Sequence, residues 1–206
     1  MDRRLSLSQL DLLRELGTIG AGRAATAMAD LIGAKVEISV PQTTLIPLEN
    51  ISGLLGGSEQ TFFVLDMGMA GDVQGRIFLL FLPEDAKTLA GGLIGKSVEE
   101  IDLNDEMFKS ALKESANIIC GSFIAALAEL TNMNIFTTVP SLAMDMVGAI
   151  LDFIFIQIAQ HSEEALYIKT DLKVSNMKFN GLFLFFPHSE SLLNIFEALG
   201  LSGEEQ

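Results

Sequence analysis

Hydrophobic and polar residues follow two different periods along the chain, one typical of helices and the other typical of strands. Between Ser8 and Ile32, apolar residues return at spacings of three, four or eight, which predicts an amphipathic helix. Ser8 is the expected N-cap of this helix, and Gly33 is the glycine expected just after its last turn. The residues from Val36 to Val40 then alternate between apolar and polar, which predicts a half-buried strand that stops at Pro41.

The same two patterns predict the rest of the secondary structure. Strands are expected at 61–69, 76–82, 135–139, 165–174 and 182–186, and helices at 84–94, 104–130 and 189–199. Asn104 and Asp105 are the N-cap candidates of the second long helix. The segment 142–160 is rich in Ile and Phe and would suit a strand or a helix. We favour a strand to Met144 and a helix from Asp145.

The order of these elements occurs twice. The stretch ELGTIGAG, which begins at Glu15, corresponds to ESANIICG, which begins at Glu114, and both lead at the same spacing to a strand and a proline. Later, GRIFLLFLP corresponds to NGLFLFFP. We therefore predict a single domain over 1–206 that contains a tandem duplication, with repeats at about 8–95 and 104–200. Two helix–strands–helix units would most simply form an α+β fold, with both long helices packed on one shared, largely antiparallel sheet.

Composition and charge restrict the partners of such a domain. The 206 residues are 49% hydrophobic and include 14 Phe, which supplies enough apolar area for a sizeable core. Acidic residues number 27 against 13 basic ones, for a net charge of −14, so we expect repulsion from nucleic acids and anionic membranes. This charge suits partners with basic patches. Adaptation to salt is an alternative that composition does not separate from it.

Cysteine and histidine usage argues against a metal site. The single cysteine, Cys120, excludes an intrachain disulfide and a cysteine-based zinc site, and we expect it to be a buried core thiol. His161 and His188 share no metal-ligand spacing. The chain opens with no secretory signal, and its most apolar stretch, 147–159, is too short to span a bilayer. We therefore expect no metal, no membrane insertion and a cytoplasmic location.

The repeated octapeptide carries two polar residues three positions apart. At about 100° per residue, their side chains project about 60° apart, so Glu114 and Asn117 share one helix face, and so do Glu15 and Thr18. A solvated helix face is the ordinary alternative for such a glutamate, but an asparagine inside a helix is less ordinary because it disfavours helix formation. A further polar residue stands one turn before each glutamate: Asp11 and Ser110.

The run GTIGAGRAAT in the first helix has the glycine spacing of a nucleotide-binding loop. Such a loop lies between a strand and a helix, whereas this run lies inside a predicted helix. We expect its small residues to let the two long helices, or a helix and the sheet, approach closely.

Two longer segments, LLRELGTIGAGRAATAMADLIGAKVEISVP and SALKESANIICGSFIAALAELTNMNIFTTVP, resemble the signature helices of the CheC family of bacterial and archaeal chemotaxis proteins. The resemblance extends from about Ser8 to Gly200 and includes MDMVGAI and LFLFFP. It implies a phosphatase that acts on the aspartyl-phosphate of the response regulator CheY. The enzyme would need no cofactor of its own, because the regulator supplies its own Mg²⁺.

The resemblance also implies roles for the polar residues on the two helices. Glu114 would bind a cation of the regulator, its conserved active-site lysine, and Asn117 would hold the attacking water. Glu15 matches the family pattern, but Thr18 stands where the family has asparagine. We therefore expect the second repeat to carry most of the activity.

The resemblance further implies that the neighbourhood of MDMVGAI docks CheD, a receptor-modifying deamidase. Asp145 is the candidate contact residue, with a role as helix N-cap as the equally weighted alternative. The rival to a phosphatase is a non-catalytic adaptor that binds CheD or the flagellar switch. The change at Thr18 would be a step toward such a protein, but the intact pair of Glu114 and Asn117 argues against it.

Overall fold

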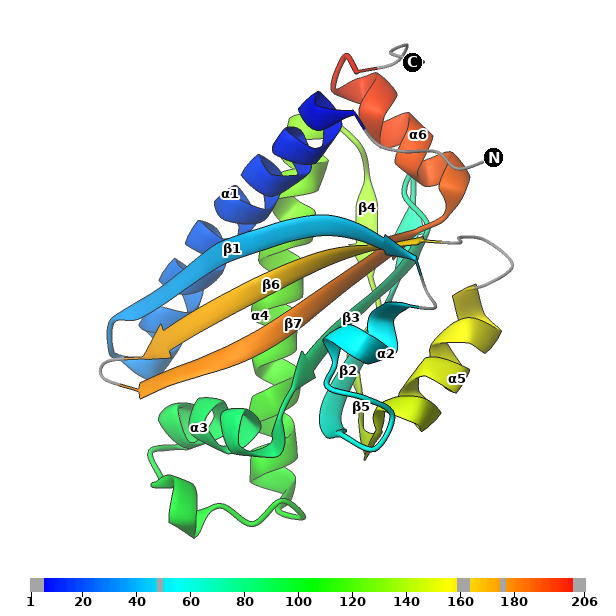
Figure 1. The fold of residues 1–206 in the computed structure, drawn as a ribbon. Coiled ribbons are helices and arrows are strands. Elements are labelled where there is room, and N and C mark those ends of the chain that lie inside the picture. The colour runs from blue at the N-terminus through cyan, green and yellow to red at the C-terminus, as the bar shows by residue number, and fades with distance from the viewer. Residues whose placement is uncertain (1–5, 48–49, 159–163, 175–176, 202–206) are drawn as a thin grey trace.

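A seven-stranded antiparallel sheet forms the centre of the protein (Figure 1). The computed structural model describes residues 6–47, 50–158, 164–174 and 177–201. The helices are α1 (Leu7–Ile32), α2 (Ile51–Leu54), α3 (Pro83–Ile94), α4 (Glu106–Thr131), α5 (Val147–Ile158) and α6 (Ser189–Ala198). The strands are β1 (Val36–Pro47), β2 (Thr61–Gly71), β3 (Gly75–Phe81), β4 (Ile135–Thr137), β5 (Ser141–Met146), β6 (Glu164–Val174) and β7 (Met177–Pro187). The predicted α+β class with two long helices over a largely antiparallel sheet is confirmed.

The strand order is symmetric about the middle of the sheet. It reads β1-β6-β7-β3-β2-β4, with β5 also paired to β2. If the elements of the two halves are exchanged, β6 takes the place of β2, β7 that of β3, and the order is reproduced in reverse. A duplication would produce this arrangement, and the common origin of the two halves stays a prediction.

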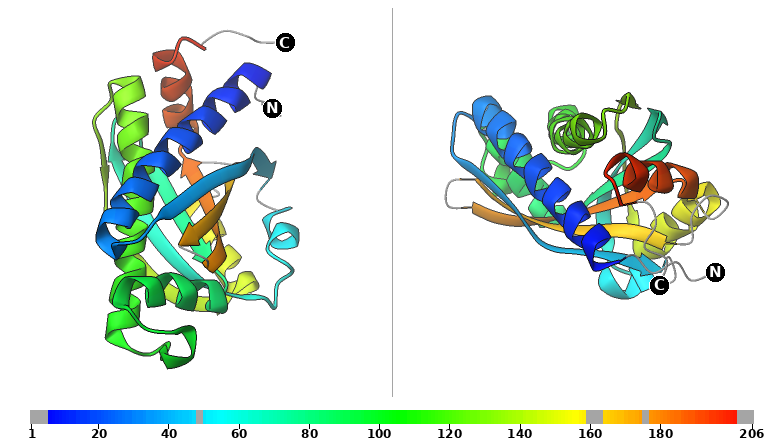
Figure 2. Two further views of the ribbon diagram at one scale, coloured as in Figure 1. Left: turned by 90° about the vertical axis from the view of Figure 1, so that its left-hand side faces the viewer. Right: turned by 90° about the horizontal axis from the view of Figure 1, so that it is seen from above.

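The two faces of the sheet are covered by different helices. Figure 2 shows α1 and α4 together on one face and α5 on the other. Alternate residues of β2 divide between these layers: Phe63 and Leu65 belong to the core under α1 and α4, whereas Phe62 and Val64 belong to the core under α2 and α5. Because both faces of β2 are buried, its sequence is a continuous apolar run instead of an alternating one.

The ends of the two long helices follow ordinary capping rules, with one correction. The prediction of Ser8 as N-cap was wrong, because α1 begins at Leu7 and Ser6, two residues before Ser8, caps it. The Ser6 hydroxyl accepts from the Gln9 amide at 3.2 Å, and the Gln9 side chain accepts from the Ser6 amide at 2.9 Å. At the other end, Gly33 closes α1 with a positive φ of 70°, as predicted. Asp105 caps α4 by accepting from the Met107 amide.

Several strand boundaries differ from the prediction, because pairing partners decide them. β7 begins at Met177 instead of 182, since it pairs with β6 from that residue on. β1 does not stop at Pro41 but continues to Pro47, with a register shift between Ser39 and Gln42. β1 lies at the end of the strand order, where a proline that lacks an N–H is tolerated. β4 ends at Thr137 instead of 139.

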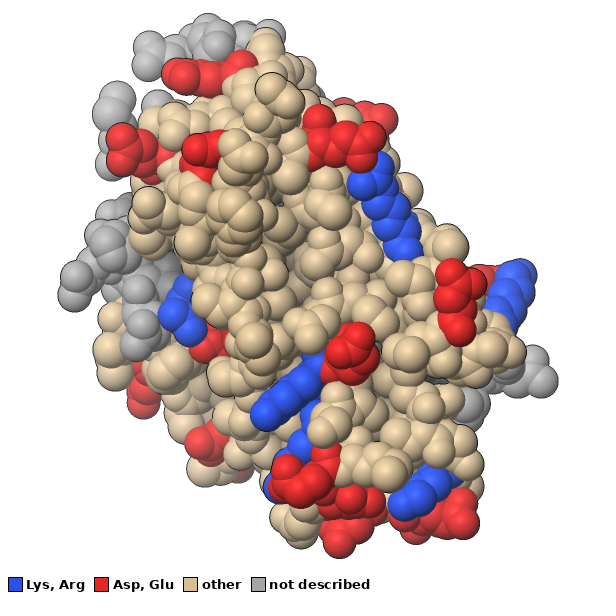
Figure 3. All heavy atoms as spheres, turned by 180° about the vertical axis from the view of Figure 1, so that it is seen from behind, with Lys and Arg blue, Asp and Glu red and all other residues tan. Residues whose placement is uncertain are grey.

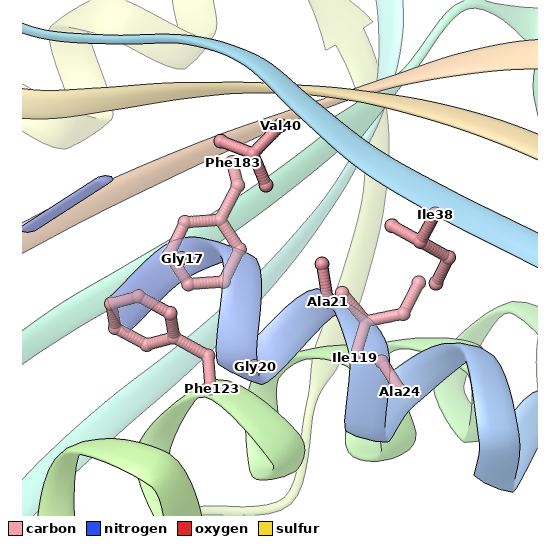
Figure 4. A pocket seen from close by; sticks show the side chains of 9 residues that line it. All are labelled: Gly17, Gly20, Ala21, Ala24, Ile38, Val40, Ile119, Phe123 and Phe183. Atoms are coloured by element: carbon pink, nitrogen blue, oxygen red, sulfur yellow. The ribbon is translucent and has the colours of Figure 1, made fainter. Parts of the chain in front are cut away.

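The close approach of α1 to α4 depends on a glycine. A Cβ atom at Gly20 would lie 2.8 Å from the Cα of Phe123, which is closer than atoms can pack. Figure 4 shows the small residues of α1 facing Phe123, Ile119 and the sheet around an apolar cavity of about 20 Å³. The expectation that the small residues of GTIGAGRAAT allow close helix packing is confirmed.

One helix of the described chain, α4, is long and apolar enough to cross a membrane by length and composition alone. However, 56% of its most apolar window is buried inside the fold. This burial is typical of the core helix of a domain folded in water, and α4 packs against α1, α3 and the sheet.

Gly20→Ala should destabilise the protein by about 1–3 kcal/mol, because the new methyl group would push α1 away from the Phe123 backbone. Gly22→Ala is the matched control. It lies on the same helix with nothing within 4 Å of its added Cβ, and alanine should stabilise the helix there by about 0.5–1 kcal/mol. Urea denaturation of both variants measures the difference. Equal midpoints would show that the helices do not touch at Gly20.

Candidate functional site

Glu114 and Asn117 both lie on the solvent-exposed face of α4. Ser115 and Ala116, between them in sequence, are fully buried and fix the orientation of the helix. Among the described residues, neither Glu114 nor Asn117 forms a side-chain hydrogen bond or an ion pair. Figure 3 shows the molecule from the side of α4, where uncharged residues form most of the middle of the face. Both polar groups are therefore free to meet a partner that docks on α4.

The corresponding pair on α1 differs in its second member. Glu15 and Thr18 are both exposed, as the helical spacing predicts. The Thr18 hydroxyl donates to the carbonyl oxygen of Arg14 at 2.9 Å, so its oxygen is held against the helix backbone. The Asn117 carboxamide is one atom longer and makes no such bond. The two helix faces thus present different groups at the same position of the repeat.

The structure keeps these two pairs apart. Figure 1 shows α1 and α4 running in opposite directions, and they pack most closely where Gly20 meets Phe123. Each polar pair precedes this crossing along its own helix, so the pairs lie on opposite sides of the crossing. They form two separate candidate sites and not one composite site.

The supporting residues Asp11 and Ser110 are exposed one turn before the glutamates, where the repeat places them. In the described part of the chain, neither side chain forms a hydrogen bond or an ion pair. Their exposure on the same helix faces allows both residues to contact a docked partner. Their proposed supporting role stays a prediction.

Asp145 lies at the end of β5 and not at the start of a helix. The expected helix start at Asp145 was wrong, because β5 extends to Met146 and α5 begins at Val147. The Asp145 carboxylate accepts from the Met146 amide at 2.8 Å. The first amides of α5, those of Val147 and Gly148, donate instead to the backbone carbonyls of Gln60 and Ser58. Backbone groups therefore fill the role that an N-cap carboxylate at position 145 would have had.

Asp145 also lines a groove of about 320 Å³ between β2, β5 and α5. Its apolar wall includes Ile150 and Phe153, and its floor includes Asp66. Asp66 is buried and forms two hydrogen bonds with the Arg76 guanidinium, one of them from Nε at 3.0 Å. This groove was missed in the sequence, where the only signal for it was an acidic residue inside the apolar run FFVLDM.

The single cysteine is unsuited to nucleophilic catalysis. Cys120 is 1% exposed, and burial raises the pKa of its thiol to about 12, so it stays protonated at neutral pH. The prediction of a buried core thiol is confirmed. In the part of the chain that the structure describes, no group of three or more His, Cys, Asp or Glu side chains is placed to hold a metal ion.

Family models of chemotaxis proteins match both halves of this architecture. The model described as chemotaxis phosphatase CheX matches residues 63–152, and that of the CheC-like family matches residues 9–45. The CheY-P phosphatase CheC of Bacillus subtilis is 33% identical over 198 residues, which cover 94% of this chain and 95% of that protein. The chain therefore belongs to the CheC family of chemotaxis phosphatases, and the resemblance seen in its two long helices is confirmed.

Solved structures share the fold at low sequence identity. FliY of Thermotoga maritima superposes with a TM-score of 0.78 at 19% identity, covering 98% of this chain and 100% of that one. CheX of Desulfovibrio desulfuricans superposes with a TM-score of 0.52 at 17% identity, covering 83% of this chain and 99% of that one. The fold of this chain is therefore shared with both of these proteins.

Proposed function

We propose that this chain hydrolyses the aspartyl-phosphate of a CheY-type response regulator at the Glu114/Asn117 face of α4. The observation that carries the proposal is an exposed glutamate and carboxamide, without partners of their own among the described residues, on a helix whose other side is locked in the core. The family to which the chain belongs supports the same activity.

The chemistry needs little from the enzyme beyond position. An acyl phosphate is already activated, and Mg²⁺ on the regulator neutralises the charge that develops on the phosphoryl oxygens. The carboxamide oxygen of Asn117 accepts a hydrogen bond from one water and holds it in line with the bond between phosphorus and the aspartyl oxygen. The water oxygen then bonds to phosphorus as the aspartyl bond breaks. The products are inorganic phosphate, a free aspartate and one proton released to solvent. The chain needs no cofactor of its own for this step.

Glu114 contributes to binding of the regulator and not to the chemical step. One turn from Asn117 on the same face, its carboxylate binds a cation of the regulator and fixes the register in which the two proteins meet. Because the buried side of α4 is packed in the core, the amide of Asn117 then always takes the same position relative to the docked regulator. The Thr18 hydroxyl on α1 is shorter and is bonded to Arg14, and a misplacement of about 1 Å costs roughly 100-fold in rate. The α1 site is therefore the weaker one.

Addition of the protein to a purified regulator, phosphorylated by a small-molecule donor and freed of that donor, should accelerate loss of the phosphoryl group. Asn117→Ala should reduce this acceleration about 100-fold, because the water loses its acceptor, while circular dichroism and melting temperature stay unchanged. Thr18→Ala is the matched control and should have little effect. Unaltered decay with the wild-type protein would favour a non-catalytic adaptor. Loss of activity in Thr18→Ala alone would assign catalysis to α1.

Thr18→Asn should raise the rate or leave it unchanged, because it places a carboxamide on the exposed face of α1 next to Glu15. The effect is clearest in an Asn117→Ala background, where the α1 site acts alone and part of the lost activity should return. The same decay assay measures it. A lower rate than that of the background variant would show that the α1 face does not receive the regulator.

We also propose that the protein acts in the cytoplasm, where CheY-type regulators work, and that the groove beside Asp145 docks a CheD-type deamidase. The groove combines an exposed carboxylate with the partly exposed aromatic ring of Phe153, which suits a partner with a basic residue beside an apolar one. The acidic balance of the whole chain favours the same kind of partner.

Asp145→Ala should weaken binding of a recombinant CheD-type protein about threefold or more while the melting temperature is kept, because backbone carbonyls already satisfy the first amides of α5. Asp152→Ala, which removes an exposed carboxylate from α5 itself, is the matched control. Calorimetric titration and thermal melting provide the two readouts. A drop in melting temperature without a change in affinity for the CheD-type protein would show that Asp145 has a structural role and not a binding role.

A further inference from the structure

Basic side chains are scarce in this acidic protein, and most of those described are already paired with a carboxylate. The paired ones are Arg23, Lys35, Arg76, Lys87, Lys96, Lys109 and Lys173. Among the described side chains, Arg14, Lys113 and Lys169 form no ion pair. Lys169 belongs to β6, but Arg14 and Lys113 occupy equivalent places in the two long helices, each immediately before the glutamate of its site.

Helix geometry places Lys113 beside the amide that would hold the water. Lys113 and Asn117 are four residues apart, so their side chains project about 40° apart on neighbouring turns, with Cβ atoms about 5–6 Å from each other. Glu114 projects about 60° from Asn117 on its other flank. The carboxamide therefore stands between one cation and one anion, both a turn earlier on α4.

The ammonium group of Lys113 is free to reach a partner. Its side chain is exposed, and the carboxylate of Glu106, two turns earlier on α4, is engaged by Lys109 at 2.7 Å. The pKa of Glu106 is lowered mainly by the hydrogen bond from Lys109, and Lys113 adds only a smaller, longer-range attraction. The flexible stem of a lysine allows its charge to follow a docked surface.

A negatively charged substrate would be bound better by a surface with a cation next to Asn117. A phosphorylated regulator presents a phosphoryl dianion in an acidic pocket, and this chain also is negative, with a net charge of −14. Approach of two like charges slows association unless the contact surface itself carries the opposite sign. Lys113 supplies a positive charge one turn from Asn117, at the place where the phosphorylated pocket would meet α4.

We propose that Lys113 is a docking residue that binds the anionic rim of the phosphorylated pocket and counters the repulsion between the two proteins. The inference rests on the proposed phosphatase function and adds a second charged contact to that of Glu114. Lys113 acts on association and not on the bond-breaking step, since Asn117 alone addresses the water. Arg14 is its counterpart beside Glu15 on α1.

The test compares Lys113→Met with Lys109→Met, which removes the same charge from the same helix. Lys109 is five residues before Glu114, about 140° around the helix, and its charge is already paired with Glu106. Lys113→Met should raise KM about 2- to 5-fold at low ionic strength, with kcat unchanged, and the effect should disappear in high salt. Lys113→Arg should restore the wild-type KM, and Lys109→Met should leave KM unchanged.

A binding measurement separates this inference from the proposed function. Regulator loaded with beryllofluoride and Mg²⁺, a stable mimic of the phosphorylated state, is titrated into wild type and both variants at low and high salt. Weaker, salt-dependent binding by Lys113→Met alone supports the inference, even if the wild-type protein shows no hydrolysis. Equal affinities of the two variants, or a fall in kcat at unchanged KM, would overturn it. Absence of hydrolysis by the wild type would instead count against the proposed function.

Discussion

The contact between α1 and α4 at Gly20 is the constraint on which the rest of the structure depends. Without a side chain at this position, the backbone of α1 lies against Phe123, whose ring in turn packs on Phe183 and Phe185 of the sheet. Both helices are therefore fixed in rotation as well as in position. Because the apolar sides of both helices are buried in one core, their opposite sides must face the solvent. These sides carry the pair Glu15 and Thr18 on α1 and the pair Glu114 and Asn117 on α4.

This rigidity is what would allow such plain residues to carry the proposed catalytic function. The polar face of α4 contains no activated nucleophile, and the one thiol nearby is buried and protonated. A carboxamide contributes only the place where it holds a water, so its effect is limited by how firmly its backbone is held. Burial of Ser115 and Ala116 directly beside Asn117 provides that firmness. The proposed site would suit a substrate that brings its own leaving group and metal, and would serve poorly for an unactivated ester.

The features that could be predicted from the sequence are those that local geometry decides. Helical spacing alone places Glu114 and Asn117 on one face, and the periodic apolar residues and Gly33 gave most of α1 correctly. The errors fall where distant segments decide. β1 continues through Pro41 because it is an edge strand paired only to β6, and α5 starts late because carbonyls of 58–60 receive its first amides. The groove at Asp145 could not be predicted, because β2, which is distant in sequence from β5 and α5, forms part of its lining.

If the two halves arose by duplication, they show how a repeated site could diverge without harm to the fold. Position 18 is exposed, so a change from carboxamide to hydroxyl there affects neither the core nor the packing at Gly20. The threonine then bonds to its own helix at Arg14, an interaction that a side chain of this length makes readily. A basic residue followed directly by a glutamate is present in both halves, as Arg14 and Glu15 and as Lys113 and Glu114. In the proposed mechanism, recognition and water positioning thus reside on different side chains of one helix face, so that either could change while the other is kept.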